Sequence, residues 1–139
     1  MPASGVNIVI PSGTDYSPII SSSGAVANNV TVNSSAILTI SSGGDFTVSG
    51  NFSNAGTVNI SSDSNEYGSL ILEGSTSGNI TYNRYVNTVA VESEWDLVGS
   101  PVGSQSISGF VTSNNGSLAT NGNQYAIGTY SNALSLIHI

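Results

Sequence analysis

Apolar and polar residues alternate in short runs over the first two thirds of the chain. Such alternation is typical of β-strands with one buried face. The gaps between these runs read NSSA, SSGGD, SGN, SNAG and EGSTSG, and they favour turns because Gly supplies positive φ and Asn tolerates the left-handed region. The alternating pairs are Val6-x-Ile8-x-Ile10, Val30-x-Val32, Leu38-x-Ile40, Phe46-x-Val48, Val58-x-Ile60, Leu70-x-Leu72 and Ile80-x-Tyr82.

Two architectures fit short strands at this spacing, a meander of hairpins and a stacked solenoid. Strands of two apolar residues are short for a sandwich, where about five or six residues are usual. The segments NNVTVNSSA, AILTISSGG and GDFTVSGNF share one frame, and a period near 20 residues separates Leu38 from Val58. We therefore predict an all-β protein with a parallel β-solenoid, in which each coil buries its apolar face on its neighbours.

The composition changes along the chain and predicts four segments. Residues 1–27 are expected to form an N-terminal strand and an atypical capping loop, and residues 28–78 the solenoid coils. Residues 79–133 gather aromatic residues and are expected to begin a β-sandwich-like module that is incomplete, with strands at 79–86, 95–99, 107–112 and 124–130.

Residues 134–139, LSLIHI, form an apolar cluster without the Gly and Asn of the preceding chain, and they hold the single histidine. This stretch resembles the translation of a transposase mosaic end used as a sequencing adapter. We expect it to be a non-native tail and exclude His138 from the search for chemistry.

The charge balance excludes several classes of partner. The chain has 139 residues, half of them Ser, Thr, Asn or Gly, and its eight acidic residues against one strong base, Arg84, give a net charge of −7. Such a surface repels phosphate backbones, so no nucleic acid partner is expected. No apolar run is long enough to span a bilayer. Cysteine is absent, which excludes disulfides and thiolate metal sites.

Two acidic groups are candidates for a cation, and calcium is the only cofactor that the sequence leaves open. Asp63, Asn65 and Glu66 place oxygen ligands on a predicted loop, although such residues also build ordinary solvated turns. Glu92, Glu94 and Asp96 alternate along an extended segment and would project from one face. The second group could hold a cation, but the flank of an exposed loop is the simpler interpretation.

Three aromatic residues, Tyr82, Tyr85 and Trp95, could line a platform for sugars, or could belong to a core. Arg84 lies between the two tyrosines and is expected to make a cation–π contact or an ion pair, the latter with the acids at 92–96. Catalysis is not expected, because sugar lyases need a base and a neutralising cation and the chain offers neither Lys nor a native His.

Four segments between residues 28 and 133 are distinctive: LTISSGGDFTVSGNFSNAGTVNI, GSLILEGSTSGNITYNRYV, EWDLVGSPVGSQSI and LATNGNQYAIGTYSNA. Through these segments, residues 28–133 resemble modules of large secreted surface proteins of flavobacteria and their relatives. The resemblance implies export by the type 9 secretion route, with signal and sorting domain outside these residues, and a cell-surface location. The resulting hypothesis is a non-catalytic structural or adhesive segment that contacts glycans or surface proteins. A carbohydrate-binding module and, further off, part of a polysaccharide-degrading enzyme are the alternatives, and the oligomeric state is left open.

Overall fold

The computed structural model describes residues 5–86, 105–118, 120–121, 123–125, 127, 129–131 and 136–138. The chain divides into two units between residues 96 and 97, and each is described by itself. The first unit holds β1 to β11 and the second holds α1 and β12 to β15.

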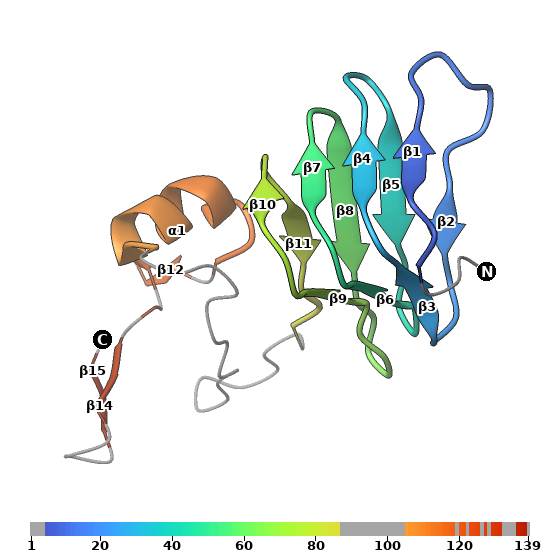
Figure 1. Ribbon diagram of the computed structural model, residues 1–139. Helices are drawn as coiled ribbons and strands as arrows, with labels where there is room; N and C mark the ends of the chain where they lie inside the picture. The colour runs from blue at the N-terminus through green and yellow to red at the C-terminus, as the bar shows by residue number, and fades with distance from the viewer. Residues whose placement is uncertain are drawn as a thin grey trace. The chain divides into compact units, whose positions relative to one another are not determined.

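The first unit is a three-sided parallel β-solenoid, in which successive coils stack side by side along one axis (Figure 1). Each sheet is built from the matching strands of successive coils, and all neighbouring strands of these three sheets run parallel. One sheet holds β1 (Ile8–Ile10), β4 (Val30–Val32), β7 (Phe52–Asn54) and β10 (Thr76–Ser77). The second holds β2 (Ile19–Ile20), β5 (Ile37–Ile40), β8 (Thr57–Ser61) and β11 (Thr81–Asn83). The third holds β3 (Ala25–Ala27), β6 (Asp45–Val48) and β9 (Ser69–Leu72). The predicted parallel solenoid is confirmed.

The core is a column of aliphatic and aromatic side chains that stack from coil to coil. Ile40 pairs with Ile20 on one side and with Ile60 on the other, and Tyr82 continues the row. Phe46 lies between Ala25 and Leu70, so that the small alanine leaves room for the ring. The most deeply buried side chains are Phe46, Phe52, Leu38, Ile40, Val30, Val32, Val48 and Val58. The apolar members of the predicted alternating pairs therefore point inward, as the sequence pattern indicated, except Val6, which is exposed.

A ladder of asparagines runs along one corner of the column, immediately before the strands of the first sheet. Asn29 donates from Nδ2 to Asn7 Oδ1 at 2.9 Å, and its own Oδ1 accepts the backbone N–H of Asn51 at 2.8 Å. Asn51 Oδ1 in turn accepts the N–H of Ser75 at 3.3 Å. The amide side chains thus satisfy corner N–H groups that the sheet ladders do not reach.

The solenoid extends beyond residues 28–78 at both ends. The residues expected to form an N-terminal strand and capping loop form a complete first coil, because β1, β2 and β3 each pair with the matching strand of the second coil. At the other end, β11 pairs with β8 over Thr81–Asn83. The short strands II and AVA were not predicted, because residues 11–29 have the composition of turns. These strands are stabilised by stacking on the neighbouring coil rather than by their own length.

The second unit contains a helix where the sequence analysis expected a strand. The prediction of a strand over 107–112 is wrong, because Ile107–Asn114 form α1. Ile107, Phe110 and Val111 have the i, i+3, i+4 spacing of a helical face, and the Ser106 side chain accepts the Gly109 N–H at 3.0 Å as the N-cap.

Two short antiparallel pairs complete the described part of the second unit. β12 (Thr120–Asn121) pairs with β13 (Gln124–Tyr125), and β14 (Thr129–Ser131) pairs with β15 (Leu136–His138). The predicted strand 95–99 lies outside the described residues, so the β-sandwich-like module stays a prediction. The non-native origin of residues 134–139 also stays a prediction.

Candidate functional site

The most elaborate surface feature of the solenoid is the corner loop, residues 62–67, which joins β8 to β9. The loop begins and ends with an antiparallel bridge between Ser62 and Tyr67. The N–H of Asp63 donates to the carbonyl oxygen of Glu66 at 2.9 Å, which closes the turn. Figure 1 shows the loop projecting beyond the coil at this corner. The turn is therefore a small hairpin added to the third coil.

Asp63 holds this hairpin together through its carboxylate. Its Oδ1 accepts the backbone N–H groups of Asn65 at 2.8 Å and Glu66 at 2.9 Å. A hydrogen bond from the Ser42 side chain of the second coil is the main cause that lowers the pKa of Asp63 below its ordinary value of 3.8, and the two backbone hydrogen bonds lower it further. The side chain therefore has a structural role in the turn and remains ionised at neutral pH.

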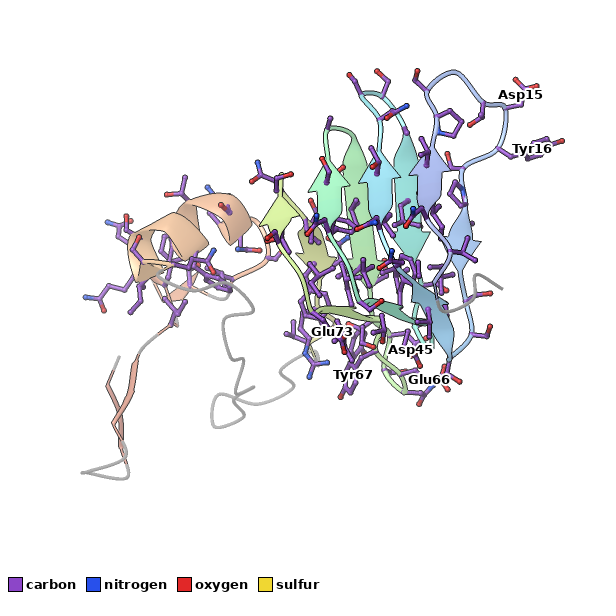
Figure 2. The ribbon with its side chains drawn as sticks, viewed as in Figure 1. Asp15, Tyr16, Asp45, Glu66, Tyr67 and Glu73 are labelled. Atoms are coloured by element: carbon purple, nitrogen blue, oxygen red, sulfur yellow. The ribbon has the colours of Figure 1, made fainter. Side chains whose placement is uncertain are left out.

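The first calcium candidate, Asp63, Asn65 and Glu66, lies together on this hairpin. Asp63 is occupied by the three hydrogen bonds, and the Glu66 carboxylate reaches back over Gly43 of the second coil. Figure 2 labels Glu66 beside Tyr67 at the same corner. Among the residues that the structure describes, no three His, Cys, Asp or Glu side chains gather as a group that could hold a metal ion. Calcium binding stays a prediction.

The second acidic candidate, Glu92, Glu94 and Asp96, lies outside the described residues. Trp95, the third member of the expected aromatic platform, lies there too. The structure therefore leaves the grouping of these four side chains as a prediction.

The two tyrosines of the expected platform have different surroundings. Tyr82 packs against the end of the apolar column and is half-buried. Tyr85 is 42% exposed, and its backbone N–H donates to the Ser62 hydroxyl. Tyr82 therefore contributes mainly to packing, and Tyr85 is the tyrosine of this pair that offers a ring to solvent.

Arg84 makes a cation–π contact, one of the two kinds of contact expected from the sequence, but with an aromatic residue that the sequence analysis did not single out. The Arg84 Cζ atom lies 4.0 Å from the centroid of the Tyr67 ring. Tyr67 is 56% exposed. Tyr67 precedes Arg84 by most of a coil, so only the stacking of coils brings the two side chains together. No local signal in the sequence pairs them.

Together these contacts define a corner cluster of Ser62, Tyr67, Arg84 and Tyr85 beside the acidic turn of Asp63 and Glu66. The cluster brings an aromatic ring, a guanidinium group and hydroxyl groups together at one corner of the solenoid. A planar cation stacked on a tyrosine suits the apolar faces and hydroxyls of a sugar or the carboxylate of a peptide.

The architecture places the chain in the class of parallel β-solenoid repeat proteins. Within that class, the chain belongs to the family described as "Domain of unknown function (DUF8693)", whose profile matches residues 1–133. Searches against curated proteins and against solved structures gave no match. In the part of the chain that the structure describes, no helix has the length and hydropathy needed to cross a membrane.

Proposed function

We propose that the chain is a non-catalytic structural and adhesive segment of a large secreted surface protein, in which the solenoid acts as a stiff spacer. The observation that carries the proposal is the continuous coil-on-coil column. Each further coil lengthens such a column by one strand spacing, about 4.8 Å, without a new core design. Repetition of this kind suits a stalk that holds other parts of a protein away from a surface.

The outward positions of the second and third coils support this proposal. Thr31 and Ser53 occupy the outer face of the first sheet, and Thr39 and Asn59 that of the second. Small uncharged polar side chains keep these faces hydrated. They also avoid the repulsion that like charges on neighbouring strands would cause. Surface glycans or surface proteins are the partners that we propose for such faces, and export by the type 9 route is part of the same proposal.

The location is tested on intact cells that encode the protein. An antibody against the recombinant chain should label whole cells, and brief treatment with a broad-specificity protease should remove the label before the cells lyse. A cytoplasmic protein serves as the control for lysis. Label that appears only after lysis would contradict a surface location.

A carbohydrate-binding role is the second candidate, and the exposed Tyr67 ring under Arg84 is the observation that favours it. If sugars bind there, Tyr67→Ala should abolish retention on a glycan array. Tyr16→Ala is the matched control, since Tyr16 is 88% exposed and lies in the loop between β1 and β2 (Figure 2). Equal retention of both variants would exclude the corner cluster as a sugar site.

Absence of catalysis is tested with the same preparation. The chain is incubated with neutral and acidic polysaccharides, and new reducing ends and unsaturated products are measured. We expect no turnover. A rate that copurifies with the chain would overturn the non-catalytic proposal.

A further inference from the structure

The first coil differs from the others on its outer faces. Val9 is 62% exposed and Ile19 is 65% exposed. The positions in register with Val9 in the second and third coils are Thr31 and Ser53, and those in register with Ile19 are Thr39 and Asn59. At these two positions the first coil therefore has aliphatic residues where the second and third coils have hydroxyl or amide side chains. Ile37 in the second coil and Ile71 in the third are the other strand positions with an exposed large aliphatic side chain among the described residues.

The backbone of β1 also presents an open edge. β1 is the end strand of its sheet. Ile8 donates to the Asn29 carbonyl at 2.8 Å, and the Ile10 carbonyl accepts from Asn33 at 3.0 Å, so both residues are bonded to the second coil. Since alternate residues of a parallel strand direct their N–H and C=O groups to opposite sides, those of Val9 point away from the second coil.

Edge strands are usually blocked by a charge, a proline within the strand or a bulge. β1 reads Ile-Val-Ile and has none of these. Among the described residues, none is recorded as a hydrogen-bond partner of the Val9 N–H or C=O group. Such a pair of groups in an aliphatic β-branched strand is a template for another strand.

We propose that the first coil is a self-association surface, on which β1 pairs antiparallel with β1 of a second copy about a twofold axis at Val9. Val9 is the central residue of this three-residue strand. A twofold axis at Val9 places the two Val9 residues opposite each other, so that each Val9 N–H can donate to the carbonyl oxygen of the other copy's Val9. The contact continues the coil-to-coil interface that already holds the column. The proposal goes beyond the proposed function and does not depend on it.

Charge favours this end of the column for contact between two copies. The chain carries a net charge of −7, yet Asp15 is the only charged residue between positions 5 and 29. Asp15 lies in the loop between β1 and β2 rather than on a strand (Figure 2). Two acidic chains therefore meet at their first coils with little repulsion.

The oligomeric state is measured by light scattering and sedimentation over about a hundredfold range of concentration. We expect a dimer that dissociates on dilution. Val9→Lys should weaken the dimer about tenfold or more, because two like charges would face each other across the twofold axis. Thr31→Lys, on the same face one coil inward, is the matched control and should leave the dimer intact.

Circular dichroism establishes that both lysine variants keep the solenoid. A wild-type monomer at every concentration would overturn the proposal. Species that grow beyond the dimer would indicate head-to-tail stacking, and they would overturn the twofold arrangement.

Cross-linking gives a test of the geometry, since the chain has no native cysteine. Directly opposed residues in a hydrogen-bonded antiparallel pair have Cα atoms about 5.5 Å apart, within the range that a disulfide spans. Val9→Cys should therefore give a disulfide-linked dimer under mild oxidation. Thr31→Cys should not, because its two copies would be two strand spacings, about 10 Å, farther apart than the two Val9 positions. Equal cross-linking of both variants would overturn the proposed register.

Discussion

At the scale of single residues, many polar side chains of the solenoid form hydrogen bonds with the backbone rather than ion pairs. The asparagine ladder, the Ser41 and Ser49 hydroxyls that donate to carbonyls one coil below, and Asp63 in the corner loop are examples. A solenoid has many corners where N–H and C=O groups leave the sheets, and each needs a partner. This need explains why Ser and Asn are so frequent in a folded chain.

Asn29 is the middle rung of the ladder, and its loss should be felt in stability. Asn29→Ala removes one side-chain hydrogen bond and leaves the Asn51 N–H without its acceptor. We expect the free energy of unfolding to fall by about 1–2 kcal/mol in urea titrations. Asn59→Ala, at an outward position of β8, is the control and should cost less than about 0.5 kcal/mol. Equal losses in both variants would contradict a specific role for the ladder.

Asp63 should make stability depend on pH in the acid range. Because the pKa of Asp63 is lowered in the folded state, its contribution is present above the ordinary value of 3.8 and is lost as pH falls through the lowered folded value. The Asp63→Asn variant should therefore lose less stability than wild type between about pH 5 and pH 2. Denaturant unfolding at several pH values measures this difference. An NMR titration midpoint of Asp63 at or above 3.8 would contradict it.

At the scale of elements, the strands are too short to be stable alone and are defined by their neighbours. The alternation of Leu38 and Ile40 or of Val58 and Ile60 was enough to predict strands, because those residues point into the column. Ile107, Phe110 and Val111 were read as a strand because a short apolar run is ambiguous between the two periods. The Ser106 cap, which fixes the helix, is a signal that the sequence contained.

The corners between strands depend on close backbone approach, and Gly78 is the tightest case. Its φ is +87°, and an added Cβ would overlap the backbone oxygen of Asn54 in the coil below. Gly78→Ala should cost more than about 2 kcal/mol, from clash and strain together. Gly13→Ala is the control, because Gly13 also has positive φ, at +71°, but has open space around it.

We expect the control Gly13→Ala to cost only about 1 kcal/mol, the strain of a left-handed residue with a side chain. Thermal unfolding of the two variants separates the clash from the strain. A Gly78 variant no less stable than the Gly13 variant would show that the fourth coil does not pack as described.

At the scale of the whole molecule, the solenoid is a one-dimensional stack, so its stability should vary along the axis. Amides in the second coil, such as those of Val32, Ile40 and Val48, have a coil on each side. They should exchange with solvent more slowly than those of β10, which pairs with β7 alone in its sheet. Hydrogen exchange followed by mass spectrometry measures this gradient. Uniform protection would indicate that the unit unfolds as a single cooperative block.

The candidate site was predictable only in part. Asp63, Asn65 and Glu66 were placed on a loop from their sequence alone, since such residues build turns. The contact of Arg84 with an aromatic ring was expected, but its partner Tyr67 was not. The two residues lie on successive coils, and no rule of local spacing relates a loop of one coil to the residue that follows a strand of the next.

The sequence by itself determined the parallel solenoid, because the alternation selects which side chains enter the column and the period near 20 residues sets the coil. Tertiary stacking decided where the column begins and ends. It turned residues 8–27 into a full coil and carried strands to Asn83, since two- and three-residue strands exist only against a neighbour. Stacking also brought Arg84 onto Tyr67 and left Val9 at an open edge, because both follow from which coil lies beside which.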